Sequence, residues 1–203
     1  MKAKSPQALS TRCVHAGEAR DAHGSPHTPV YTTTTFSFPS TRALLDVVEG
    51  VKPGSLYTRY GLNPTIQSLE GKLASLEGGE AALAFSSCMG AEAALFLAHG
   101  RNGIVCLGDA YGGTLELLAD QLPQLGIRTA LLLGNEQQPL ALGADLVVHS
   151  ATKYLGGHSD ITAGALMGPA DLVASVAGWR KNLGTVRAPE TAAMLARSIR
   201  GGR

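Results

Sequence analysis

From Glu80 onward, short apolar runs alternate with stretches of helical periodicity, and this alternation constrains the fold more than any other feature of the sequence. The runs are EAALAF, IVCLG, IRTALLLG, ADLVVHS and GALMG, and helix-length segments such as TLELLADQLPQL lie between most of them. Strands that alternate with helices at this spacing are typical of a parallel sheet covered by helices. We therefore predict an α/β fold with a mostly parallel sheet and flanking helices.

The residues before this pattern are of a different kind. Residues 1–60 have little amphipathic periodicity and are rich in proline, threonine and aromatic side chains, so we predict an extended amino-terminal arm. Asn63 and Pro64 then supply a helix cap and a first-turn proline, and Gly78 ends that helix. The α/β domain is expected to span residues 61–203, with two further helices near residues 169–179 and 189–199.

One interval in the α/β pattern is unusually short. Only GNEQQPLALGA lies between the apolar run that ends at Leu133 and the one that begins near Asp145. A crossover between parallel strands needs at least about 10 to 12 residues, so this connection is at the lower limit. The sequence therefore predicts a stub of a helix or an unusual connection here.

Charge and cysteine content narrow the classes of function. Seventeen Lys and Arg residues against sixteen Asp and Glu leave a net charge of +1, which disfavours binding to nucleic acid or to an anionic membrane. No apolar run approaches the roughly 18 residues of a membrane span, and no signal-peptide core follows Lys2 and Lys4, so we expect a cytoplasmic protein. Charged residues make up only 16%, which suggests that other subunits cover part of the surface in a homo-oligomer.

The segment with the most specific chemistry is SATKYLGGHS, residues 150–159, which follows the apolar strand at 146–149. A lysine at the carboxyl end of a buried strand lies where open α/β sheets bind ligands, and there Lys153 can form a Schiff base. Ser150 and Thr152 beside it offer hydroxyl donors to a phosphate. A surface lysine in a glycine-rich turn is the plain alternative.

Two more strand ends could contribute to such a site. FSSCMG, residues 85–90, turns from a strand into a helix, where backbone N–H groups and the helix dipole can bind an anion. DAYGGT, residues 109–114, could lay the ring of Tyr111 flat against a planar ligand. Each of these motifs is weak alone, because ordinary turns and loop tyrosines look similar.

Other kinds of site are less well supported by the sequence. GxGxxG, GxxxxGK[ST], HExxH and GxSxG are absent, which argues against dinucleotide, P-loop, zincin and esterase chemistry. His149, His158 and Asp160 could form a metal site, but no further ligands follow, so we expect none. Cys88 at its turn could be the nucleophile of a hydrolase, although the sequence assigns no histidine as its base.

The lysine segment, DLVVHSATKYLGGHSD, resembles the signature of the Cys/Met metabolism family of pyridoxal-phosphate enzymes, which includes cystathionine γ-synthase, cystathionine γ-lyase and methionine γ-lyase. The resemblance also covers TPVYTTTTF, YTRYGLNPT, LEGGEAALAFSSCMGA and DAYGGT, and thus nearly the whole chain. It implies the large domain of a type I pyridoxal-phosphate transferase, in incomplete form, and pyridoxal 5'-phosphate as the cofactor.

The resemblance also implies a role for individual residues. Lys153 would carry the cofactor as a Schiff base and Tyr111 would stack on its ring, and both are expected to be catalytic. The remaining cofactor-binding residues implied by the family are Ser150, Thr152 and the amides of Cys88 and Met89 for the phosphate, and Tyr57 and Arg59 for the phosphate in a neighbouring subunit.

The sequence departs from the family pattern in ways that bear on activity. It ends before the family's carboxy-terminal domain with its carboxylate-binding arginine, and the short interval before Asp145 lacks the family's asparagine and the aspartate that protonates the pyridine nitrogen. Cys88 stands where glycine is usual. We predict an enzyme for elimination or replacement at the β- or γ-carbon of sulfur amino acids or activated homoserine, with slow turnover; the alternative is a non-catalytic truncated paralogue that keeps the fold and the oligomer surface.

Overall fold

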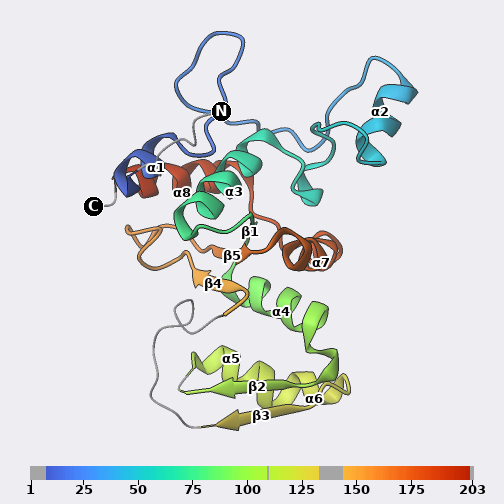
Figure 1. Cartoon of the computed structure of the whole chain (residues 1–203), viewed down its shortest axis with the longest axis vertical. Helices are drawn as coiled ribbons and strands as arrows, with labels where there is room; N and C mark the ends of the chain where they lie inside the picture. Colours follow the sequence, from blue (N-terminus) through green and yellow to red (C-terminus); the bar gives the residue numbers. More distant parts are fainter. Residues whose placement is uncertain (1–7, 109, 133–143, 202–203) are drawn as a thin grey trace, which may run out of the picture.

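The computed structural model describes residues 8–108, 110–132 and 144–201, and it has the expected mixture of helices and strands (Figure 1). The helices are α1 Leu9–His15, α2 Thr41–Val48, α3 Pro64–Glu77, α4 Cys88–His99, α5 Gly112–Glu116, α6 Leu122–Gln124, α7 Ala170–Leu183 and α8 Pro189–Gly201. Short 3₁₀ turns form η1 Thr58–Tyr60 and η2 Gly100–Asn102, and a π-helical turn forms η3 Leu117–Gln121. The strands are β1 Ala81–Phe85, β2 Ile104–Leu107, β3 Thr129–Leu132, β4 Val147–Ser150 and β5 Gly164–Gly168.

The strands form two separate sheets in the described part of the chain. One has the order β1-β5-β4, with β5 antiparallel to both neighbours, and the other pairs β2 with β3 in parallel. The α/β fold is confirmed, but the strand directions are more mixed than the sequence indicates. The reason is the connection at 151–163, which holds turns rather than a crossover helix, so β5 runs back alongside β4.

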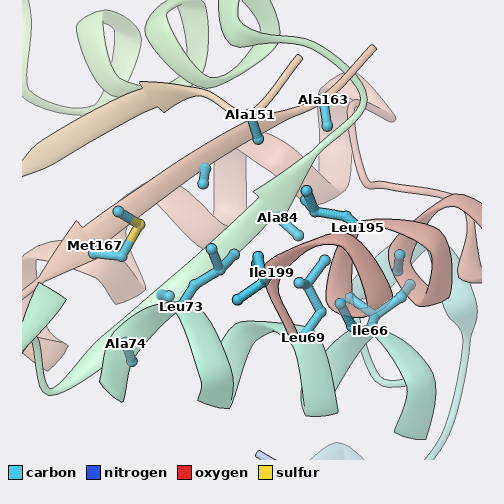
Figure 2. Packing of buried hydrophobic residues seen from close by; sticks show 14 of the residues in the cluster. Ile66, Leu69, Leu73, Ala74, Ala84, Ala151, Ala163, Met167, Leu195 and Ile199 are labelled. Carbon is cyan, nitrogen blue, oxygen red and sulfur yellow. The ribbon is translucent and has the colours of Figure 1, made fainter. Parts of the chain in front are cut away.

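Both faces of the three-stranded sheet are covered by helices, which explains why its strands are apolar throughout. In β1, Ala82 and Ala84 face α3 and α8, whereas Leu83 and Phe85 face α4 and α7. Successive residues of a strand point to opposite faces, so a strand buried on both sides needs an apolar residue at every position. Residues of the larger of the two clusters, including Ile66, Leu69 and Leu195, interlock between α3 and α8 (Figure 2).

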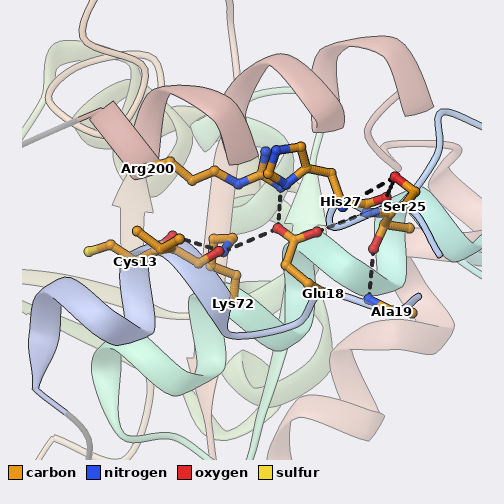
Figure 3. Close-up of polar contacts among 9 residues, drawn as sticks. Cys13, Glu18, Ala19, Ser25, His27, Lys72 and Arg200 are labelled. Atoms are coloured by element: carbon orange, nitrogen blue, oxygen red, sulfur yellow. Dashed lines mark hydrogen bonds and ion pairs between the residues drawn. The ribbon is translucent and has the colours of Figure 1, made fainter.

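The beginning of the amino-terminal arm packs onto its own chain. Lys72 of α3 is fully buried, and its ammonium donates to the carbonyl oxygen of Cys13 at 2.8 Å and lies 3.4 Å from Glu18 (Figure 3). Glu18 also accepts from Arg200 of α8. The arm therefore holds α1 and a buried ionic anchor up to Glu18, and α2 and η1 lie further along it. The expectation of an extended segment applies only to the stretches between these elements.

A smaller unit, residues 100–132, lies beyond α4 from the main sheet (Figure 1). Its parallel pair β2–β3 packs on Leu117, Leu118 and Leu122, and this cluster rests against the side of α4 formed by Met89, Ala93 and Phe96. Helix α4 thus lies between the two sheets and packs against both. No helix among the described residues is both long and apolar enough to cross a membrane.

Candidate functional site

The start of α4 has backbone amides without a partner among the described residues. Ser87 caps the helix, and its hydroxyl accepts from the amide of Gly90 at 3.0 Å. Within the described residues no acceptor is found for the amides of Cys88 and Met89, which point out of the first turn with the positive end of the helix dipole. Gly164 of β5 packs directly against this turn, and a Cβ at Gly164 would collide with the carbonyl oxygen of Ser87.

The end of β4 reaches the same place from the other side. Ser150, its last residue, lies beside Cys88, where β4 contacts α4. The hydroxyl of Thr152 donates to the carbonyl oxygen of Ala163 at 3.2 Å and accepts from the amide of Ala163 at 2.9 Å. Ser150 therefore joins the start of α4, whereas Thr152 closes the loop between β4 and β5.

Lys153 lies in that loop and is exposed in this single chain, not buried as its place after a strand suggested. Its backbone amide donates to Ser150 and its carbonyl accepts from Gly157, so the turn that carries it is fixed. Ser159, in the same loop, has a φ of 57°, a left-handed conformation that costs about 1 kcal/mol or more outside glycine. Lys153 lines a depression of about 790 Å³, and the other residues that line it are Thr152, Tyr154, Gly157, Ser159, Asp160, Ile161 and Thr162.

Tyr111 comes from the smaller unit, at the start of α5, and is 74% exposed. A Cβ added at Gly113 would lie 3.0 Å from the Tyr111 ring and 3.2 Å from the sulfur of Met89, so the ring stands close to the start of α4. Thr114 of α5 donates to Glu92 of α4 at 2.6 Å. The hydrogen bond to Glu92 fixes α5 against α4 and holds Tyr111 near the first turn of α4.

The thiol of Cys88 is kept protonated by its surroundings. Burial, the negative charge of Glu92 and a hydrogen bond to Glu92 at 3.4 Å raise the pKa of Cys88 to about 12, against a small lowering by Ser150. A nucleophilic cysteine needs a lowered pKa, and no histidine among the described residues hydrogen-bonds to this thiol. These surroundings argue against the hydrolase alternative.

Tyr57 and Arg59 are not brought to this site within one chain. The guanidinium of Arg59 donates to the carbonyl oxygen of Lys181 at 2.7 Å and stacks on the rings of Tyr57 and Tyr60, 5.2 and 5.1 Å from their centroids. Tyr57 lines a separate apolar depression between α2 and α7, which shares no residue with the one beside Lys153.

The histidines of the hypothetical metal site have other partners. His149 lies 2.9 Å from Glu77 of α3, and the ring of His158 hydrogen-bonds to the carbonyl of Gly156 at 2.9 Å. In residues 8–108, 110–132 and 144–201, no group of three or more His, Cys, Asp or Glu side chains is placed to hold a metal ion.

Ser150, Cys88, Met89 and Tyr111 thus meet around the first turn of α4, and the loop that carries Lys153 begins directly after Ser150. Glu92, which hydrogen-bonds to both Cys88 and Thr114, also lies at this turn, and the sequence did not single it out. Its signal was present, since residues four apart on a helix share a face and Glu92 follows Cys88 by four.

Proteins of known function are similar to this chain over most of its length. The L-methionine gamma-lyase of Pseudomonas putida is 34% identical over 252 residues, covering 95% of this chain and 63% of the relative. The cystathionine gamma-synthase of Mycobacterium tuberculosis is 35% identical, covering 78% of this chain and 54% of the relative. The crystal structure of metB from Corynebacterium glutamicum matches with a TM-score of 0.84 at 29% identity, covering 96% and 64%. The chain therefore spans less than two thirds of these relatives.

The alignment also carries an internal gap. The alignment with the L-methionine gamma-lyase is 252 positions long, but it contains only 95% of the 203 residues of this chain. Roughly 60 positions of the relative therefore have no counterpart in this chain. The model of one family, described as "Cys/Met metabolism PLP-dependent enzyme", matches in two segments, residues 10–137 and 130–201, that meet at the short interval before Asp145. That interval falls largely in residues 133–143, outside the described part. The two segments together cover nearly all of the sequence, and the chain belongs to the Cys/Met metabolism family of pyridoxal-phosphate-dependent enzymes.

Proposed function

We propose that this chain binds pyridoxal phosphate through Lys153 and catalyses elimination or replacement at the β- or γ-carbon of a sulfur amino acid or an activated homoserine. The observation that carries the proposal is the meeting of Ser150, the residue before the lysine loop, with the first turn of α4. The amine of Lys153 and the amides of Cys88 and Met89, which would bind the phosphate, therefore lie on neighbouring elements. The names of the relatives support the substrate class, because they are methionine and cystathionine enzymes.

The residues at the turn suit the cofactor's phosphate. The free amides of Cys88 and Met89 donate along the helix axis, and the Ser150 hydroxyl adjoins them. The Thr152 hydroxyl is already committed to Ala163, so its proton could reach a phosphate only after that bond opens. Tyr111, exposed and next to Met89, offers a ring face to the planar heterocycle.

The chemistry divides between cofactor and protein. When bound, pyridoxal phosphate withdraws electrons from the Cα of an amino acid. Lys153 would attach the cofactor, and its amine, when free, would act as the base at Cα. Its exposure to solvent in the single chain leaves room for a second subunit to cover this depression.

We also propose a cytoplasmic homo-oligomer in which Tyr57 and Arg59 of one copy reach the cofactor phosphate of another. A guanidinium is suited to bidentate binding of phosphate, and Arg59 binds only a backbone carbonyl and two rings among the described residues. Three free cysteines, Cys13, Cys88 and Cys106, fit a reducing compartment.

Borohydride trapping tests the proposal directly. The purified chain is incubated with pyridoxal phosphate and reduced, and the adduct is mapped by mass spectrometry. We expect it on Lys153 and expect Lys153→Ala to lose it, while Lys52→Ala, an exposed lysine paired with Asp46, keeps it. An adduct on another lysine, unchanged by Lys153→Ala, would refute the assignment.

A further inference from the structure

Glu92 of α4 is a half-buried carboxylate that has no cation beside it among the described residues. Within the described residues, Asp46, Glu18, Glu70 and Glu77 each lie within 4 Å of an arginine, lysine or histidine. Asp21 is the other half-buried carboxylate without a cation in this part of the chain, but it accepts the backbone amides of His23 and Ser25 in its own turn. A counter-ion stabilises a partly buried carboxylate, so the position of Glu92 suits a cation.

The two hydrogen bonds that Glu92 does receive come from neutral groups. The hydroxyl of Thr114 donates to Oε2 at 2.6 Å and the thiol of Cys88 to Oε1 at 3.4 Å. Because the Cys88 thiol keeps its proton, both partners are donors and neither neutralises the carboxylate. A carboxylate can accept about four hydrogen bonds, so Glu92 retains capacity for one more donor.

The position of Glu92 matches the cofactor-binding groups on either side of it. Glu92 is one helical turn, about 5.4 Å, along α4 from the amides that would hold the phosphate. On its other side, Thr114 ties it to α5, whose first residues carry Tyr111. A cofactor with its phosphate at these amides and its ring on Tyr111 would have Glu92 between the two groups that hold it.

We propose that Glu92 is the carboxylate that keeps the ring nitrogen of bound pyridoxal phosphate protonated, accepting its N–H. The inference rests on the proposed function. A pyridinium would be the missing cation, and a charge-assisted hydrogen bond to Glu92 would stabilise the protonated ring, which is the better electron acceptor. Glu92 would thereby take the role of the family's aspartate, which the short interval before Asp145 lacks.

A purely structural role would make Glu92 a clamp between α4 and α5. A clamp requires only an acceptor for Thr114 and Cys88, and a glutamine side-chain oxygen would serve as well. The charge distinguishes the two roles, so the test compares Glu92→Gln, which removes the charge, with Thr114→Val, which removes the clamp and leaves the carboxylate.

The measurement is the ¹⁵N chemical shift of the ring nitrogen in protein loaded with ring-labelled pyridoxal phosphate, followed against pH. An opposite charge at this range shifts a pKa by about 1 to 3 units, so we expect Glu92→Gln to lower the pH at which the nitrogen loses its proton by that amount. Thr114→Val and Glu116→Gln, an exposed glutamate of α5, should leave it within about half a unit.

A second readout needs no cofactor. Since the charge of Glu92 helps to raise the pKa of Cys88, Glu92→Gln should lower the pH at which this thiol becomes alkylated, with the modified peptide identified by mass spectrometry. An unchanged pH profile of alkylation would show that the carboxylate does not face this turn, and would overturn the inference.

The outcomes separate the two proposals. If the wild-type chain forms no borohydride adduct at Lys153, the proposed function fails and the role of Glu92 fails with it. If the adduct forms but the nitrogen titrates alike in the wild type and in Glu92→Gln, or shifts equally in Thr114→Val, only the role of Glu92 is overturned.

Discussion

The main body, residues 8–99 and 144–201, and the small unit, residues 100–132, bury their apolar residues to very different extents. In the main body two clusters fill both faces of a sheet, and Ile66, Leu69 and Phe85 have no exposed surface. The small unit has one cluster behind two strands, and Val105 and Leu131 on those strands are 63% and 46% exposed. A two-stranded sheet with one covered face is marginal alone, so the small unit depends on α4 for its stability.

The difference matters for function because the proposed site draws on both regions. Lys153, Ser150 and Cys88 belong to the main body, whereas Tyr111 and Thr114 belong to the small unit. Glu92, on the shared helix, bonds across the boundary to Thr114. Tight packing in one region therefore holds the strand and helix ends that carry Lys153 and Cys88, and a few contacts of the other region hold Tyr111.

The largest expected effect is in the main body. Leu69→Ala removes a fully buried side chain from between α3 and α8, where its neighbours on three elements cannot close the space. We expect a loss of about 4 kcal/mol in the free energy of unfolding, towards the upper end for such cavities. Urea denaturation followed by circular dichroism measures it, and a loss below about 2 kcal/mol would contradict the picture of a rigid core.

The matched change in the small unit should cost less. Leu118 is as deeply buried as Leu69, but its cluster is bounded on one side by a short two-stranded sheet that can move inward. We expect Leu118→Ala to cost about 2 to 3 kcal/mol, and faster hydrogen exchange confined to residues 100–132. Equal costs for the two leucine variants, with exchange raised throughout the chain, would show that the regions unfold as one.

The sequence predicted the local elements well because each depends on neighbouring residues. The helix capped by Asn63 and ended at Gly78 is α3, and the five apolar runs each contain the predicted strand. The start of α4 also followed from a local signal, the turn from strand to helix at residues 85–90.

Contacts between distant residues could not be predicted in this way. Strand order and the reversal of β5 depend on which edges meet, and the anchor of Lys72 to Glu18 joins residues 54 positions apart without any shared motif. Glu92 escaped notice for a related reason. Its partner Thr114 lies in another helix, and without that contact a glutamate in α4 looks like a solvated charge.

Glu18 provides a pH-dependent test of the arm's attachment to the main body. Burial raises the pKa of Glu18, but Arg200, the amide of Thr28 and Lys72 together outweigh it, and the net pKa lies below the ordinary 4.5. The folded chain therefore binds this proton less readily than the unfolded chain, and the stabilisation is complete above pH 4.5 and is lost as the pH falls through the lowered value.

The variant Glu18→Gln removes that dependence. We expect it to cost about 2 kcal/mol near neutral pH, since it weakens the hydrogen bond from Arg200 and removes the ion pair with Lys72. The difference from the wild type, measured by urea denaturation at several pH values, should shrink below pH 4.5. A difference that stays constant down to pH 3 would mean that the charge of Glu18 does not stabilise the arm.

The smallest expected effect lies on the exposed face of the small unit. Val105→Thr replaces one methyl group by a hydroxyl at a 63% exposed position, so we expect the free energy of unfolding to change by less than about 0.5 kcal/mol. The same substitution at Val176, fully buried between α7 and the sheet, should cost about 1 to 3 kcal/mol because its hydroxyl loses water. Both variants are compared by urea denaturation at high and low protein concentration. A cost at Val105 that matches Val176 at high concentration and disappears on dilution would mean that a second copy covers this face, and the contrast between the regions would then hold only for the isolated chain.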